Sequence, residues 1–181
     1  MNNADEEKVV ARLAEIVALE CGIAPAKAKQ IRVAASLHDI GKLRIPGEIL
    51  NKPGKLTAAE FDVIKTHTTL GEAMLRSIQG ELGELARLIA RYHHEWYSGC
   101  GYWGRFTHEF PAAVSITAIA DVFTALCFDR PYKSAWPPEE ALAYIQKQSG
   151  AQFDPLLVEV FLPLVRDDSR VSAIFKVSNE S

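Results

Sequence analysis

The sequence is poor in several features that mark specialised classes of protein. It has only three cysteines, Cys21, Cys100 and Cys127, and they are widely spaced. This spacing excludes a disulfide framework or a thiolate zinc site and favours the reducing cytoplasm. No run of sequence reaches the roughly 18 apolar residues of a membrane-spanning helix, and the acidic start MNNADEEKVV does not resemble a signal peptide. We therefore expect a cytoplasmic protein without membrane insertion.

An excess of positive charge is also absent. The 181 residues include 20 Lys and Arg against 23 Asp and Glu, which gives a net charge of −3. This balance argues against a DNA or RNA polymer as partner. An anionic ligand would need a local cluster of cations or a metal ion. Apolar residues make up 48% and charged residues 24%, as in ordinary globular domains, so disordered, collagen-like and coiled-coil chains are excluded.

Almost every long segment has the apolar periodicity of a helix. Capping signals mark several starts: Thr57 and Glu60 have the spacing of a capping box, and Asp154 precedes a proline. We predict about seven helices, at residues 5–21, 25–40, 57–75, 81–95, 111–128, 139–148 and 155–165. The predicted fold is an all-α, single-domain helical bundle over residues 1–166, followed by a polar tail at 167–181 that frays.

Polar side chains interrupt the apolar faces of these helices. Five of them lie on or beside faces that should be buried: His38, His67, His93, His94 and Asp121. A carboxylate inside an apolar helix is costly unless it is paired or bound to a metal. Any one histidine could be a core residue bonded to a carbonyl. Together with Asp39, however, the set suits an interior site for iron, manganese or zinc, and Asp39 could bridge two metals.

Three cations follow these polar residues in the sequence. Lys42 comes soon after His38 and Asp39, and Arg130 and Lys133 come just after the segment that carries Asp121. A single Lys or Arg is normally a solvated side chain. In an acidic protein, a group of cations near a metal site is what a phosphate ligand would need.

A set of ordered motifs resembles a known family. HDIGK at residues 38–42 is followed by LRIPGEILNKPGKLTAAEF, His67, HHE at 93–95, ADVFTAL, DRPYK and QFDPLLVEVF. This order resembles the HD-GYP branch of the HD-domain metal phosphohydrolases, whose members are typically cyclic di-GMP phosphodiesterases. The resemblance extends from about Ala11 to Val165, nearly the whole chain.

The resemblance implies a set of functional residues. It implies metal ligands at His38, Asp39, His67, His93, His94 and Asp121. It implies catalytic roles for Asp39, Lys42 and Asp121. It implies substrate contacts at Lys42, Tyr102, Arg130 and Lys133. The implied cofactors are one or two divalent ions, iron or manganese before zinc, magnesium or nickel. The implied reaction is hydrolysis of cyclic di-GMP to linear pGpG, or onward to GMP, by a water that the metals activate.

Two departures from the family pattern bear on this function. The family pattern HHExxDGxGYP reads HHEWYSGCGYW here, so Ser98 and Trp103 replace an aspartate and a proline. In the family this loop shapes the substrate entrance and meets GGDEF-domain partners. Trp103 could instead stack on a guanine or pack locally. A ligand histidine of the first helix is replaced by Glu6, so Glu6 or Glu7 could supply an oxygen ligand, unless they only complement the helix dipole.

Three functions therefore stay open. The first is a cyclic di-GMP phosphodiesterase. The second is a weakly active or inactive module that binds the dinucleotide or docks a partner. The third is a phosphohydrolase that acts on another nucleotide.

Overall fold

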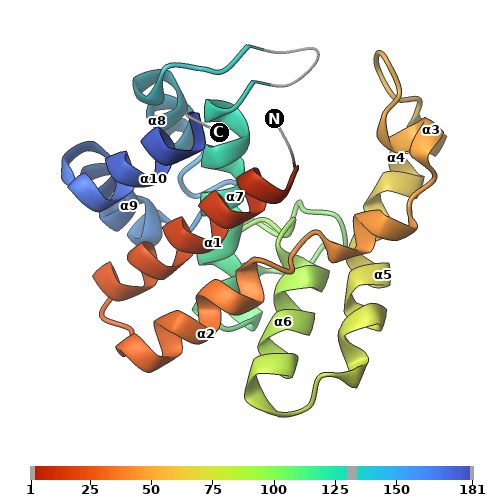
Figure 1. The fold of residues 1–181 in the computed structure, drawn as a ribbon, viewed down its shortest axis with the longest axis horizontal. Helices are drawn as coiled ribbons and strands as arrows, with labels where there is room; N and C mark the ends of the chain where they lie inside the picture. Colours follow the sequence, from red (N-terminus) through yellow and green to blue (C-terminus); the bar gives the residue numbers. More distant parts are fainter. Residues whose placement is uncertain (1–2, 130–133, 180–181) are drawn as a thin grey trace.

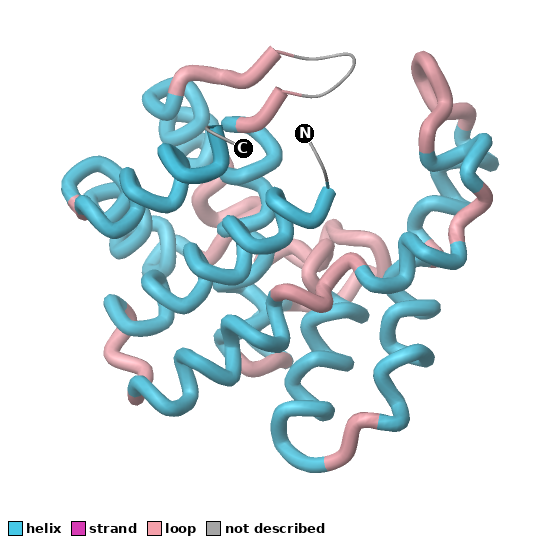
Figure 2. Tube along the Cα trace, viewed as in Figure 1, coloured by secondary structure: helices cyan, strands magenta, loops and turns pink. Residues whose placement is uncertain are grey.

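The computed structural model describes residues 3–129 and 134–179, with side chains over 5–129 and 134–175. Within these residues there are helices and loops but no strand, so the predicted all-α fold is confirmed (Figure 2). The α-helices are α1 (Asn3–Glu20), α2 (Pro25–Ala35), α3 (Gly47–Leu50), α4 (Ala58–Lys65), α5 (His67–Met74), α6 (Gly80–Tyr92), α7 (Ala112–Cys127), α8 (Pro138–Lys147), α9 (Pro155–Asp167) and α10 (Ser169–Asn179). The 3-10 helices are η1 (Ile40–Arg44), η2 (Leu75–Ser77) and η3 (Thr107–Glu109).

Helix α7 is the central helix of the core. Its sequence is apolar on nearly every face, and residues such as Ile119 and Phe123 are fully buried. Helix α1 packs against α2 and α7, while α6 packs against α2, α5 and α7 (Figure 1). The apolar core takes residues from α1, α2, α6 and α7 and also from α8, α9 and α10, and α5, which carries His67, packs against α6.

The C-terminal segment differs from the predicted fraying tail. Residues 169–179 form α10, which packs against α1. Val171 and Ile174, three residues apart, are buried, and the Phe175 ring contacts Phe123 and Phe128. The prediction was wrong because few apolar residues, set among polar ones, are enough to attach a short helix to an existing core.

Two predicted helices end earlier than periodicity suggests. Helix α2 stops at Ala35, since the N–H groups of Leu37 and His38 bond to carbonyls three residues back, those of Ala34 and Ala35. Helix α6 stops at Tyr92. The predicted helix 57–75 is divided at Thr66, whose N–H and hydroxyl both bond to Val63 O. These breaks, with α3 and α10, raise the count from the predicted seven to ten α-helices in the described residues.

The predicted caps are confirmed. Thr57 and Glu60 form a reciprocal capping box at the start of α4, and the Asp154 side chain accepts the Leu156 N–H at the start of α9. Helices α3 and α4 form an arm that stands apart from α8–α10 (Figure 1). None of the described helices is both long and apolar enough to span a membrane.

Candidate metal centre

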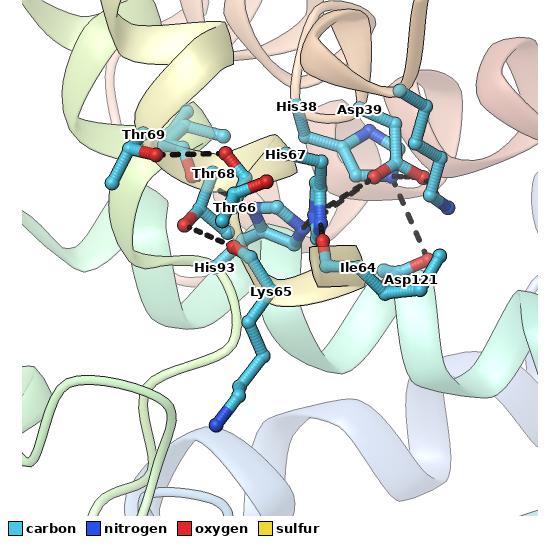
Figure 3. A network of polar contacts seen from close by, with 12 residues as sticks. His38, Asp39, Ile64, Lys65, Thr66, His67, Thr68, Thr69, His93 and Asp121 are labelled. Carbon is cyan, nitrogen blue, oxygen red and sulfur yellow. Dashed lines mark hydrogen bonds and ion pairs between the residues drawn. The ribbon is translucent and has the colours of Figure 1, made fainter. Parts of the chain in front are cut away.

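Six side chains predicted from the sequence meet at one point of the bundle. Figure 3 labels five of them, all except His94. They come from four segments: the turn after α2, the first residue of α5, the end of α6 and the middle of α7. They form two overlapping groups whose ligand atoms lie within 4.8 Å of one another, namely Asp39, His67, His93 and His94, and His38, His93 and Asp121. The predicted set is therefore brought together completely.

Backbone carbonyls orient three of the histidine rings. The Nδ1–oxygen distances are 2.8 Å for His38 and Ala35, 2.7 Å for His67 and Ile64, and 3.0 Å for His93 and Ile89. A carbonyl can only accept a hydrogen bond, so each Nδ1 carries the proton. In a neutral ring this leaves Nε2 as an acceptor, and all three Nε2 atoms face the interior of the cluster. These carbonyls lie three or four residues before each histidine, at the places where the helices stop or restart.

Asp39 lies between the two groups. Its Oδ2 is 3.3 Å from His38 Nε2, while its Oδ1 is 3.3 Å from His67 Nε2 and 3.8 Å from His93 Nε2. On the far side, Asp121 Oδ1 is 3.6 Å from His38 Nε2. One carboxylate oxygen of Asp39 thus faces each group, which is the geometry of a bridging carboxylate.

The cluster contains acceptors that face one another without a donor. Asp39 Oδ1 is buried and has no hydrogen-bond partner among the described residues, and the Nε2 atoms of His67 and His93 are 3.4 Å apart. Such an arrangement is unfavourable unless a cation lies between the acceptors. The nitrogen and oxygen donors suit a divalent metal ion of the first transition row. These residues therefore fit a metal ion and could hold one or two.

The site's electrostatics keep most of the donors in the form that binds metals. Burial lowers the pKa of His67 and His93, and it lowers the pKa of His94 to about 4, so these three rings are neutral near pH 7. Burial also lowers the pKa of His38, but the carboxylates of Asp39 and Asp121 outweigh it and hold this pKa well above its ordinary value.

The carboxylates of Asp39 and Asp121 are ionised because His38 lies close to both. Burial raises the pKa of both Asp39 and Asp121, but the nearby His38 outweighs burial and holds both pKa values below their usual range. Without a metal ion, His38 is thus a cation that compensates both aspartates, and Lys42 adds a second positive charge beside Asp39. Neutral imidazoles and ionised carboxylates are the forms that ligate a metal.

A glycine allows the close approach of two ligand-bearing segments. A Cβ atom on Gly41 would collide with the backbone carbonyl of His67. Helix η1 therefore packs directly on α5, which brings Asp39 and His67 together. This close packing explains why position 41 of HDIGK is a glycine, and no catalytic role for Gly41 is needed.

The predicted substrate contacts are only partly within the described residues. Lys42 forms an ion pair with Asp39 Oδ2 at the edge of the cluster. The Tyr102 ring lies 4.4 Å from the ring of His94, and burial raises the pKa of Tyr102 to about 12, so its hydroxyl stays protonated. Arg130 and Lys133 lie outside the described residues.

The first helix supplies an acidic residue beside the cluster. Burial raises the pKa of Glu7, and the charges of His38, Asp39 and Lys42 also act on its carboxyl.

Sequence reasoning missed one functional feature of the loop at 96–105. Glu95 is 1% exposed and accepts hydrogen bonds from the N–H groups of Trp103 and Arg105, each at 2.7 Å. Trp103 itself packs locally, on Arg91 and Thr68, rather than offering both faces to a ligand. The signal available in the sequence was a carboxylate directly before a glycine-rich loop, whose free N–H groups need acceptors.

The sequence profile of the HD domain family matches residues 2–157. This chain belongs to the HD domain family. The resemblance inferred from HDIGK and the motifs after it is thus confirmed.

Several characterised proteins are similar to this HD domain. The chain is 42% identical over 154 residues to the cyclic di-GMP phosphodiesterase response regulator RpfG of Xanthomonas campestris, covering 84% of this chain and 41% of that protein. It is 41% identical over 154 residues to 3'3'-cGAMP-specific phosphodiesterase 2 of Vibrio cholerae, covering 84% of this chain and 30% of that protein. The chain thus spans less than half the length of these relatives.

A solved structure confirms the HD-domain fold. The structure of Bd1817, an HDG"Y"P protein from Bdellovibrio bacteriovorus, superposes with a TM-score of 0.73 at 17% identity. The superposition covers 91% of this chain and 53% of that one. At this level of identity the likeness concerns the fold alone.

Proposed function

We propose that this HD domain hydrolyses cyclic di-GMP to linear pGpG. The observation that carries the proposal is the converging set of acceptors around Asp39, whose Oδ1 is buried and finds no hydrogen-bond partner in the part of the chain that the structure describes. The names of the similar phosphodiesterases support the choice of a cyclic dinucleotide as substrate. The six side chains would act as ligands: His38, Asp39, His67, His93, His94 and Asp121.

Bound divalent metal ions would polarise the scissile phosphate and lower the pKa of the attacking water. The protein's own side chains then have distinct roles in our proposal. Asp39 and Asp121 carry the negative charge of the centre, and Asp121 orients the water from the side of α7. Lys42, at the rim, neutralises charge that develops on the phosphoryl oxygens. The Tyr102 ring lies over His94, and a nucleobase of the substrate would pack against it.

Narrower parts of the proposal concern the metal, the partner and the compartment. Iron or manganese suits the donor set of four imidazoles and two carboxylates. Three free cysteines suit a reducing cytoplasm. Arg130 and Lys133 would bind phosphate, and the loop at 96–105 would meet a GGDEF-domain partner, in line with the family resemblance. Glu7 would replace the histidine that the first helix lacks.

The test is turnover by protein purified without oxygen and loaded with Fe(II) or Mn(II). Products of cyclic di-GMP are resolved by chromatography, and linear pGpG is expected. Asp121→Asn keeps the shape of the side chain but removes its charge, and it should lose turnover. Asp167→Asn, an exposed aspartate at the end of α9, serves as the matched control and should retain turnover.

A second substrate is favoured by one of the comparisons. Because a relative of nearly equal identity is named a 3'3'-cGAMP phosphodiesterase, 3'3'-cGAMP is assayed beside cyclic di-GMP. If the linear product forms faster from 3'3'-cGAMP than from cyclic di-GMP, the proposed substrate is wrong but the proposed reaction stands. Tight binding of either dinucleotide without product, with metal bound, would contradict the enzyme and favour a binding module.

A further inference from the structure

The loop at 96–105 is closed by a buried carboxylate. Glu95 is 1% exposed, and its two oxygens accept separate backbone N–H groups: Oε1 from Trp103 and Oε2 from Arg105, both at 2.7 Å. Gly101 packs so closely under this residue that a Cβ there would lie 2.5 Å from Glu95 Cα. The second half of the loop is thus attached at residue 103.

The Trp103 side chain extends this attachment to two helices. Its indole Nε1–H donates to Thr68 Oγ1 at 3.1 Å, and its ring lies 4.2 Å from the guanidinium carbon of Arg91. Thr68 is fully buried on α5 and follows the ligand candidate His67 directly. Arg91 lies on the last turn of α6, two residues before His93. Trp103 therefore bridges the two helices that carry His67, His93 and His94.

The residue before this bridge lies over the histidines. The Tyr102 ring is 4.4 Å from His94 and 6.4 Å from His67, and it meets Phe61 of α4 edge-on at 5.9 Å. These are contacts between rings, which fix a side chain's direction less strictly than a hydrogen bond does. Because Tyr102 is covalently joined to Trp103, its position over the rings depends on how firmly residue 103 is held.

We propose that Trp103 is a positioning residue that clamps the loop to α5 and α6 and so fixes Tyr102 over His94. The clamp has three parts: the Trp103 N–H on Glu95, the indole N–H on Thr68 and the ring on Arg91. A proline at position 103, as in the motif that this chain resembles, could make neither hydrogen bond, since it has no N–H and no indole. The substitution therefore replaces one way of fixing the loop by another.

The consequence for function rests on the proposed phosphodiesterase activity. Tyr102 touches the ligand candidates but is itself no ligand, so loosening the clamp should leave the metal site intact. Loosening the clamp should raise KM, because the Tyr102 ring is then no longer held in place to contact the nucleobase. It should leave kcat nearly unchanged. A merely structural role for Trp103 would change both parameters or neither.

The test uses three variants of the whole chain. Trp103→Phe keeps an aromatic ring and the backbone N–H, and it removes the indole donor together with the five-membered ring. Thr68→Val removes the acceptor of the same bond, together with the hydroxyl's bond to Lys65 O. Thr69→Val is the matched control, because Thr69 makes the same kind of bond, to Thr66 O, and does not contact the indole.

Two measurements are made on each variant. Amide hydrogen exchange of Trp103 and Arg105 is measured without substrate, and KM and kcat are measured with cyclic di-GMP on protein of known metal content. We expect faster exchange and a KM raised about fivefold in Trp103→Phe and in Thr68→Val, with no further rise in the double variant. The Thr69→Val control should match the parent protein in both.

Several outcomes would overturn the clamp. Unchanged exchange in Trp103→Phe would do so, as would equal effects in Thr69→Val. Faster exchange with an unchanged KM would reduce Trp103 to a structural residue and overturn its positioning role. If the parent protein turns over no cyclic dinucleotide, the proposed function fails, and exchange alone then decides whether the clamp exists.

Discussion

The histidine centre and the loop at 96–105 beside it differ in how completely their polar groups are hydrogen-bonded. In the loop every attachment is complete, since the Glu95 oxygens meet two N–H donors and the Trp103 indole meets Thr68. In the centre, backbone carbonyls orient the rings of His67 and His93, yet within the described residues their Nε2 atoms and Asp39 Oδ1 meet only other acceptors. A complete network indicates structure, whereas an incomplete one that is held rigidly indicates a missing cation.

The same contrast appears in the charges. The centre holds two ionised aspartates, and the pKa of His38 is raised by them despite burial, which lowers it. The loop's carboxylate, Glu95, is compensated by two oriented backbone dipoles, those of the Trp103 and Arg105 N–H groups. The centre should therefore respond strongly to a metal ion, and the loop should respond to changes in packing.

The largest effect is expected from Asp39→Asn. The substitution keeps the size of the side chain but removes the charge that faces both ligand groups. Metal affinity and turnover should each fall by more than about 100-fold, the upper loss seen for residues that only support ligands. Metal content by mass spectrometry and turnover measure this. Asp62→Asn, an exposed residue of α4, is the control, and equal losses in both variants would contradict a metal role for Asp39.

Gly101→Ala changes the packing of the loop at 96–105 and leaves the side chains of the histidine centre unchanged. The new Cβ would meet Glu95 Cα at 2.5 Å and His94 O at 2.6 Å, so the backbone must shift. We expect a loss of about 3 kcal/mol in the free energy of unfolding, at the upper end of overpacking effects. Urea denaturation measures it. In the control, Gly47→Ala, the new Cβ would lie 3.9 Å from its nearest neighbour, Asn51 Nδ2, and the change should be nearly neutral.

Metal removal should separate the two regions without any substitution. A chelator should lower the free energy of unfolding by about 2.7 kcal/mol relative to protein with free metal at 100 times its dissociation constant. Hydrogen exchange of the Trp103 and Arg105 amides should stay the same, because Glu95 accepts them with or without metal. Loss of that protection on chelation would show that the loop depends on the centre.

Glu95→Gln should give the smallest of these effects. The amide keeps one oxygen acceptor but turns an NH₂ group toward the other N–H, and the charge is lost. We expect a cost of about 2 kcal/mol in unfolding, typical of a hydrogen bond to a charged group, with unchanged metal content. Glu84→Gln, on the exposed face of α6, provides the comparison. A fall in metal content in Glu95→Gln would show that the histidine centre depends on the loop, against the independence proposed here.

The sequence was sufficient to predict which residues meet in the centre. Histidines on apolar stripes and Asp121 within an apolar helix are costly to bury unless they bind a partner or a metal, and the order of motifs supported the same set. Periodicity could not predict how the rings are aimed. That depends on the stops at Ala35 and Tyr92 and on the break at Thr66, which are set by hydrogen bonds to nearby carbonyls.

The loop was less predictable for a physical reason. Its acceptor, Glu95, is paired with N–H groups eight and ten residues later, and its indole clamp reaches Thr68 on another helix. Such contacts exist only after the helices have packed. Helix α10 was missed similarly, because Val171 and Ile174 become a helix face only when α1 is there to cover them.

The central claim is that the unpaired acceptors of the centre exist to hold a divalent cation. A crystal structure of the protein grown with Mn(II), with anomalous scattering recorded, tests it most directly. We predict a manganese peak in contact with Asp39, and with full loading two peaks about 3.5–4 Å apart, one beside each carboxylate oxygen. A structure without a peak, in which the Nε2 atoms and Asp39 are hydrogen-bonded directly to one another, would contradict the claim.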